Sequence, residues 1–297
     1  MKMRRFFSLS NILLVMGTLL LLASRWLSLT MPVKYKRLKP APWMTEAGLY
    51  VHCPLGLKPQ GILVLANGYN STEGYLAYNR EWQRFAEAHQ LALVEIAFAS
   101  ELDELHPKGG RGYYYPQFGS GALLLDALDK RFGGGLPLWC FGFSGGGHFV
   151  SRFQAWAPER VAAWAVCGVG WWDEPRQGDF PPGIVICGEE DERFFRCRES
   201  FEKRYALGHR ILWMAVPQSG HEIAPSSDAF VKVYFHALLT ATGTVEWTEG
   251  RTGDGWLPAD DKLLEEYRQV EVLLLRDGGG IDSVRRRAVD LPGIGQI

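Results

Sequence analysis

The residues best suited to covalent chemistry in this sequence lie in the motif Gly142-Phe143-Ser144-Gly145-Gly146, at the end of an apolar stretch. A G-x-S-x-G motif of this kind turns sharply from a strand into a helix and presents the serine hydroxyl at the turn. Glycines beside the serine let neighbouring backbone segments pass close by. Since a chain with 34 glycines also produces such motifs by chance, Ser144 is a candidate nucleophile only if a base and an acid accompany it.

The candidate base and acid are His221 and Asp191. His221 stands in a glycine-containing loop after the last strongly apolar stretch, and Asp191 follows the apolar stretch before it. A histidine in this role takes the serine proton, and a carboxylate holds the imidazole in the required tautomer. The alternatives are a loop histidine that is simply polar and an acidic run that favours a helix N-terminus. The chain order Ser144, Asp191, His221, each after a separate strand, favours the triad.

Three nearby side chains have other readings. His148 lies one helical turn after Ser144 and is expected to pack beneath the serine turn. Glu190 is a conceivable alternative acid beside Asp191. Asp173 is a weaker alternative acid because it follows an earlier strand than the acid of such a triad does.

Short apolar stretches alternate with amphipathic ones over most of the chain. Strands are expected at 48–53, 61–68, 91–99, 136–143, 161–170, 183–190 and 210–218. Helices are expected at 75–90, 122–131, 145–156, 194–205 and 229–239. Apolar strands separated by amphipathic helices indicate an α/β fold, with a mostly parallel central sheet and helices on both faces. Such a sheet would place the three candidate residues together beyond the carboxyl ends of its strands.

The motifs ANGYN, GFSGGG, GVGWW and GEED, spread over about Ala47–Thr240, resemble those of the α/β-hydrolase superfamily. Within it they are similar to the cutinase-like polyester hydrolases and to the poly-hydroxyalkanoate depolymerase and feruloyl esterase group. The resemblance implies an α/β-hydrolase fold over 47–240 and a Ser-His-Asp triad. No cofactor is expected, and no Cys/His spacing in the sequence fits a zinc site.

The cutinase-like resemblance also assigns residues around the nucleophile. In those enzymes a Gly-Tyr turn follows the first central strand, and a tryptophan follows the strand after the serine turn; Gly68-Tyr69 and Trp171 or Trp172 occupy these positions. The backbone N–H groups of Gly145 and Tyr69 are the expected oxyanion-hole donors. One residue departs from the pattern, because those enzymes commonly carry Met or Gln where this chain has Gly145. The side chains expected to contact substrate are those of Tyr69, Trp171, Trp172 and Tyr114.

The first thirty residues form a separate part of the chain. A basic start precedes an apolar run, Ile12–Ala23, that extends to about nineteen residues if Phe6–Ser24 is counted. This pattern predicts a signal peptide or an N-terminal membrane anchor over 1–30, with the uncleaved anchor favoured, followed by a linker over 31–46. The catalytic domain is therefore expected outside the cytoplasm, tethered through residues 6–24 or released. Basic residues on both flanks leave the orientation of an anchor open.

The C-terminal extension, 241–297, lies outside the hydrolase pattern. One amphipathic helix is expected within 259–280, with Leu263, Leu264, Tyr267, Val270 and Leu274 on its apolar face. A net charge of −1 gives no electrostatic case for nucleic-acid binding. The five cysteines are an odd number without metal-ligand spacing, and they leave the disulfide state open.

Together these patterns predict a serine hydrolase that cleaves carboxylic esters through an acyl-enzyme intermediate. Aromatic side chains expected at the carboxyl edge of the sheet suit an aryl ester or a polyester chain. Two alternatives stay open: a serine peptidase of the same fold, and a non-catalytic anchored binding module. The sequence does not separate hydrolysis from acyl transfer to another alcohol, and it leaves the oligomeric state open.

Overall fold

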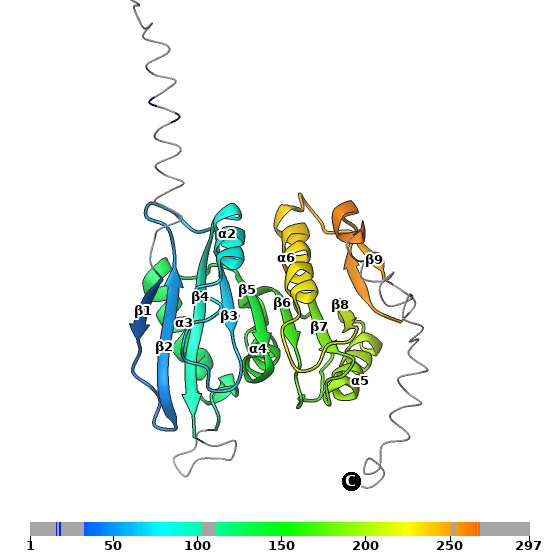
Figure 1. Cartoon of the computed structure of the whole chain (residues 1–297), viewed down its shortest axis with the longest axis horizontal. Coiled ribbons are helices and arrows are strands. Elements are labelled where there is room, and N and C mark those ends of the chain that lie inside the picture. The colour runs from blue at the N-terminus through cyan, green and yellow to red at the C-terminus, as the bar shows by residue number, and fades with distance from the viewer. Residues whose placement is uncertain are drawn as a thin grey trace, which may run out of the picture.

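A computed structural model of the chain describes residues 33–101, 111–250 and 253–265, together with Met16, Thr18 and Tyr267. Its centre is an eight-stranded sheet with the strand order β1-β2-β4-β3-β5-β6-β7-β8 (Figure 1). β1 and β2 pair antiparallel to their neighbours, and every pairing from β4 to β8 is parallel. The strands are β1 (Lys34–Arg37), β2 (Met44–His52), β3 (Gly61–Ala66), β4 (Leu91–Ser100), β5 (Leu138–Phe143), β6 (Val161–Cys167), β7 (Gly183–Gly188) and β8 (Ile211–Val216).

Five helices longer than one turn cover this sheet on both faces within the described ranges. They are α2 (Arg80–Ala88), α3 (Ser120–Phe132), α4 (Ser144–Trp156), α5 (Phe194–Ala206) and α6 (Pro225–Thr240). Apolar residues of α3, α4 and α5 belong to one core cluster, and those of α2 and α6 belong to the other. The mostly parallel sheet between two helical layers confirms the predicted α/β class.

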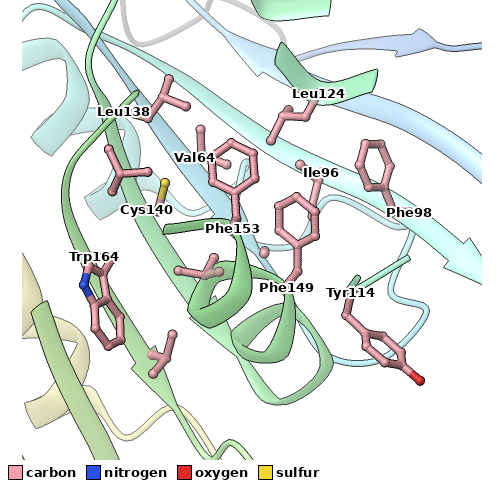
Figure 2. Close-up of a cluster of buried hydrophobic side chains, with 14 of the residues drawn as sticks. Val64, Ile96, Phe98, Tyr114, Leu124, Leu138, Cys140, Phe149, Phe153 and Trp164 are labelled. Carbon is pink, nitrogen blue, oxygen red and sulfur yellow. The ribbon is translucent and has the colours of Figure 1, made fainter. Parts of the chain in front are cut away.

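The central strands are buried on both sides, which explains why they read as continuous apolar runs in the sequence. Every residue of β3 and of β4 is buried. Successive side chains point to opposite faces, so Val64 belongs to the cluster under α4 while Leu63 and Leu65 belong to the cluster under α2 and α6. Figure 2 shows Phe149 and Phe153 of α4 over the first of these clusters. Burial on both faces thus holds the central strands between the two helical layers.

Helix α2 is shorter than the helix predicted over 75–90. The side chain of Asn79 accepts hydrogen bonds from the backbone N–H groups of Glu81 and Trp82, which makes Asn79 the N-cap. The residues before it form turns, with the N–H of Tyr78 bonded to the carbonyl of Gly74 at 3.1 Å. The local cap therefore starts the helix later than its apolar spacing indicates.

Strands also occur where the sequence analysis expected none. β1 lies in the predicted linker 31–46, and all four of its residues are exposed, so it carries no apolar signal. β9 (Trp247–Glu249) and β10 (Trp256–Pro258) form an antiparallel hairpin in the predicted extension. The hairpin is joined to β8, because the N–H of Trp213 donates to the carbonyl of Asp254 at 2.8 Å. The folded unit therefore continues on both sides of 47–240.

The predicted terminal segments fall mostly outside the described residues. The signal or anchor over 1–30 stays a prediction; within the described part of the chain, no helix has the length and apolarity needed to cross a membrane. Near the other end, residues 261–265 and 267 are helical. Leu263 is buried, and Leu264 and Tyr267 pack on the cluster under α6. The predicted positions Val270 and Leu274 lie outside the described residues.

Strand β4 carries a buried carboxyl group, Glu95, whose side chain is enclosed by the fold. The residue is 1% exposed, and its Oε2 accepts a hydrogen bond from the backbone N–H of Ala77 at 2.6 Å. Its Oε1 has no hydrogen-bond partner among the described residues. Burial raises the pKa of Glu95 to about 7, although the backbone N–H groups of Ala77 and Leu76 act in the opposite direction. The folded protein therefore favours the protonated acid.

We expect Glu95→Gln to stabilise the protein in alkaline but not in acidic solution. The stability that protonated Glu95 contributes is complete below its ordinary pKa of about 4.5 and is lost as pH rises through about 7. Glutamine keeps the acceptor for Ala77 and stays neutral, so the free energy of unfolding should rise by roughly 1–3 kcal/mol at pH 8.5 and change little at pH 4.5. Urea unfolding at both pH values measures this. The exposed Glu159→Gln is the control, and equal gains at both pH values would contradict the assignment.

Candidate active site

Ser144 lies at the turn where β5 ends and α4 begins, in a strained backbone conformation. Its φ is +50°, in the left-handed region that non-glycine residues seldom adopt. The flanking glycines are explained by contact distances. A Cβ on Gly142 would lie 2.5 Å from the carbonyl oxygen of Gly146, and a Cβ on Gly146 would lie 2.2 Å from that of Ala66. The G-x-S-x-G motif thus forms the sharp turn that the sequence predicts for a nucleophile.

The three predicted residues Ser144, His221 and Asp191 form one hydrogen-bonded chain. The Nε2 of His221 lies 2.9 Å from the Oγ of Ser144, and its Nδ1 lies 2.7 Å from the Oδ2 of Asp191. They follow β5, β8 and β7, whose carboxyl ends lie at the same edge of the sheet (Figure 1). With Nδ1 protonated, the imidazole donates to the carboxylate and accepts the serine proton at Nε2. This is the arrangement of a nucleophile, a base and an orienting acid.

Arg193 holds the carboxylate of Asp191 from the side opposite His221, and the sequence analysis did not identify it. The Oδ1 of Asp191 accepts hydrogen bonds from the backbone N–H of Arg193 at 2.9 Å and from its Nη1 at 3.0 Å. Burial pushes the pKa of Asp191 upward, but the hydrogen bonds from Arg193 and His221 outweigh it, and the pKa lies below its ordinary value. Asp191 is therefore ionised when it receives the imidazole N–H.

Gly168, at the end of β6, is a second residue that the sequence analysis missed. Its φ is +65°, and an added Cβ would lie 2.9 Å from both Cε1 and Nδ1 of His221. The same Cβ would be 3.2 Å from the Oδ2 of Asp191. The backbone at Gly168 thus passes directly against the histidine–carboxylate pair, and a side chain there would displace it.

The two predicted oxyanion-hole residues lie side by side. A Cβ on Gly145 would be 2.5 Å from the Cα and 2.7 Å from the backbone nitrogen of Tyr69. This contact explains why a glycine stands here, where the cutinase-like enzymes commonly carry Met or Gln. Asn70 anchors the loop that carries Tyr69, because its side chain exchanges two 3.0 Å hydrogen bonds with the backbone of Ser100. The backbone donors at positions 69 and 145 are therefore held in a fixed relation.

The four side chains predicted to contact substrate differ in their exposure. Tyr69 is 48% exposed and Trp171 is 64% exposed. Tyr114 is only 7% exposed and belongs to the core (Figure 2), with its ring 6.2 Å from that of Tyr69, so its burial does not favour the predicted substrate contact. Trp172 is half-buried, and its indole N–H donates to the carbonyl of Val169 at 3.0 Å. Tyr69 and Trp171 are therefore the two exposed rings among the four predicted contacts.

His148 is buried beneath the serine turn, where the sequence analysis placed it. Its Nε2 accepts a hydrogen bond from the backbone N–H of Gly170 at 3.3 Å, and its ring lies 5.3 Å from that of Trp171. Burial, assisted by the nearby Arg152, lowers the pKa of His148 to about 3, so the ring is neutral. It supports the loop that carries Trp171. The alternative acid Asp173 is held by Arg152 at 3.1 Å, and the carboxylate that contacts His221 is that of Asp191.

The remaining metal-ligating and nucleophilic groups show no second constellation of this kind. Among the described residues, no three His, Cys, Asp or Glu side chains are grouped so as to hold a metal ion. All five cysteines are free thiols, and four of them are buried. Burial raises the pKa of the Cys140 and Cys167 thiols, which keeps them protonated.

Solved structures with a similar fold include three esterases. Carboxyl esterase 2 from the mycorrhizal fungus Tuber melanosporum has a TM-score of 0.52 and 12% identity, with 71% of this chain and 87% of that chain covered. An arylesterase has a TM-score of 0.53 and 12% identity, with 75% and 91% covered. A hyperthermophilic esterase from the archaeon Pyrobaculum calidifontis has a TM-score of 0.52 and 13% identity, with 73% and 90% covered. No protein-family model and no curated protein matches the sequence. The predicted α/β-hydrolase fold is confirmed.

We expect Gly168→Ala to slow the reaction of Ser144 with a fluorophosphonate by about 10²-fold, as an ångström-scale displacement of a reacting group typically does. The added methyl group would press on His221 and Asp191. An alanine would also be strained at the positive φ of this position. Gly220→Ala is the matched control, because Gly220 adjoins His221 in sequence and a Cβ there meets nothing within 4 Å. Labelling rates, with circular dichroism to check folding, measure the difference. Similar rates in both variants would mean that Gly168 does not hold the pair.

Proposed function

We propose that the protein is a serine hydrolase that cleaves carboxylic esters. The observation that carries this proposal is the hydrogen-bonded chain Ser144–His221–Asp191, set on a strained turn beside two backbone N–H groups. The similar solved structures named above are esterases, which supports the reaction class. We retain no second candidate function, because no observation favours a peptidase or a binding module over an ester hydrolase.

Acylation of Ser144 would be the first half of the reaction. As the Oγ of Ser144 bonds to the ester carbonyl carbon, the Nε2 of His221 takes the hydroxyl proton. The carbonyl oxygen becomes an oxyanion that the backbone N–H groups of Gly145 and Tyr69 stabilise. The bond to the alcohol oxygen then breaks, and the imidazolium returns its proton to that oxygen. Asp191, ionised and held by Arg193, stabilises the imidazolium and keeps its orientation.

Deacylation would use the same groups with water as the nucleophile. The Nε2 of His221 takes a proton from water as the water oxygen attacks the acyl carbon. The tetrahedral intermediate again places its oxyanion at Gly145 and Tyr69. When the bond to Ser144 breaks, the imidazolium protonates the Oγ, and the carboxylic acid leaves. The free enzyme is thereby restored without a change of redox state.

The proposed substrate class is an aryl ester or the end of a polyester chain. Exposed aromatic rings favour an ester that carries a flat group. Tyr69 and Trp171 are exposed rings in the loops that follow β3 and β6. Each is supported from below, Tyr69 by Tyr114 at 6.2 Å and Trp171 by His148 at 5.3 Å between ring centroids. Rings fixed in this way lose little side-chain freedom when they stack on a substrate, which favours binding.

We expect Ser144→Ala to abolish hydrolysis of short p-nitrophenyl esters, with a loss on the order of 10⁶ in kcat for a triad that acts as a unit. A fluorophosphonate should label the wild-type protein at one serine, and peptide mapping should place the label on Ser144. Ser71→Ala, in the neighbouring loop, serves as the control that keeps full activity. Wild-type activity in Ser144→Ala, or a label on another serine, would overturn the proposal.

We expect Trp171→Ala to lower kcat/KM for an aryl-acyl ester more than for an acetate ester. Aromatic stacking contributes about 0.5–1.5 kcal/mol, or roughly twofold to tenfold per contact. The comparison uses p-nitrophenyl benzoate and p-nitrophenyl acetate, and Trp156→Ala is the control, since Trp156 is also exposed but lies at the far end of α4 from Ser144. Equal losses on both esters would show that Trp171 only supports the fold.

A further inference from the structure

A hollow lies between the loop 170–175 and helix α5. It has a volume of about 340 Å³ and is lined on the helix side by Arg196, Ser200 and Arg204, among others. We call it the α5 groove. Positions 196, 200 and 204 are four residues apart and so lie along one side of the helix, over about 12 Å. The volume is within the range that binds a small ring or a short chain.

The α5 groove begins next to the hydrogen-bonded triad residues. Gly168 lies against His221 and Asp191, and Gly170, two residues further along, lines the groove. Two residues of chain span at most about 7 Å. Trp171, whose ring lies 5.3 Å from that of His148 one helical turn after Ser144, also lines the groove. A substrate attached at Ser144 can therefore extend past Trp171 into the groove.

Most charges along the groove are neutralised by ion pairs, but two arginines are not. Lys203 pairs with Glu174 and Glu199, and Asp173 pairs with Arg152. Within the described part of the chain, Arg196 and Arg204 form no ion pair. Arg196 donates only a long, 3.4 Å hydrogen bond to the carbonyl of Gly170. The lining itself holds three cations and three carboxylates, so an anion would be drawn by these two unpaired arginines and not by a net positive charge.

Arg204 is the less usual of the two arginines because it is buried. It is 5% exposed, and it donates to the Oγ and carbonyl oxygen of Ser200 and to the carbonyl oxygen of Asp173. Its guanidinium lies 4.9 Å from the ring centroid of Trp172. Burial lowers the pKa of Arg204 to about 10, so it stays charged at neutral pH. The carboxylates of Asp173 and Glu174 act on this pKa in the opposite direction, although neither forms an ion pair with Arg204 among the described residues.

We propose that the α5 groove binds a carboxylate carried by the ester substrate, with its ring against Trp171 and Trp172 and its anion on Arg196 and Arg204. The planar guanidinium groups match a carboxylate in geometry and charge. This inference rests on the proposed function and adds a substrate class, namely esters whose aromatic part bears one free carboxylate.

The test compares esters that differ only in this charge, using the full chain. 4-Acetoxybenzoate and 4-acetoxybenzamide place the group on the alcohol side, and methyl 4-carboxybenzoate and methyl 4-carbamoylbenzoate place it on the acyl side. In at least one pair, we expect kcat/KM of the anionic ester to exceed that of the neutral ester by about tenfold, as a charge-assisted contact provides. The preference should appear mainly in KM.

Arginine variants then locate the preference. Arg196→Gln should reduce the anionic-to-neutral ratio about threefold to tenfold, and Arg204→Lys should reduce it while keeping the charge, because lysine lacks the planar fork. Arg210→Gln is the matched control, since this arginine is in a surface pair with Asp179 outside the groove. Arg196 is exposed, so its replacement leaves the fold intact even if a change at Arg204 does not.

The failures of the two proposals are distinguishable. Cleavage of the neutral esters with no preference for either anionic ester would overturn the groove assignment alone, as would an Arg196→Gln variant with an unchanged ratio. If no ester is cleaved and no fluorophosphonate labels Ser144, the proposed function fails. Isothermal titration of Ser144→Ala with 4-methylbenzoate and 4-methylbenzamide then tests whether the groove binds a carboxylate. Tighter binding of the anion, lost in Arg196→Gln, supports it, and equal or absent binding of both overturns it.

Discussion

The first turn of α4 lies with its backbone directly on the end of β3, and the rest of the site depends on this contact. No side chain fits between Gly146 and the carbonyl of Ala66, since a Cβ would be 2.2 Å from that oxygen. The approach fixes Ser144 at positive φ above the sheet. It also brings Gly145 against Tyr69 in the loop that leaves β3. The nucleophile and both oxyanion donors are thus placed by close backbone contacts, and the side chain of Asn70 anchors the loop that carries Tyr69.

The acid and the base reach Ser144 through the register of the parallel strands. Along the sheet, Phe143 is paired with Cys167, Cys167 with Ile186, and Ile186 with Met214, so the strands end at nearly the same level. Glycines then let the loops that follow touch. A Cβ on Gly188 would lie 2.1 Å from the carbonyl oxygen of Ser219, which joins the loop of Asp191 to that of His221. The register of the parallel strands therefore brings the three loops together, and the hydrogen bonds of the triad fix the final distances.

Sequence reasoning found what depends on strong local patterns. The order of Ser144, Asp191 and His221 after apolar strands was readable, because each strand is almost entirely buried and each loop follows its carboxyl end. β1 was not readable, since its four residues are all exposed and give no apolar pattern. The same limit applies to Gly168 and Arg193, whose roles arise from contacts with Asp191 and His221 that no spacing along the chain reveals.

Adjacent residues of one kind set another limit on sequence reasoning. Three tyrosines stand at 113–115, and the pattern cannot show which ring the core takes. The structure buries Tyr113 and Tyr114 and leaves Tyr115 partly buried beneath the guanidinium of Arg152 at 4.4 Å. Arg152 in turn holds Asp173. The position of the Tyr115 ring thus involves Arg152, which is nearly forty residues away in the sequence and is brought near only by the fold.

The parts that perform chemistry and the parts that contact substrate are held in different ways. Backbone contacts through glycines fix Ser144 and His221, whereas side chains hold the loop that carries Trp171. His148 is the main support of that loop, through the N–H of Gly170 and the ring of Trp171. Because the pKa of His148 is lowered to about 3, its ring is a neutral acceptor at neutral pH. The support that His148 gives to this loop therefore does not depend on a protonated imidazole.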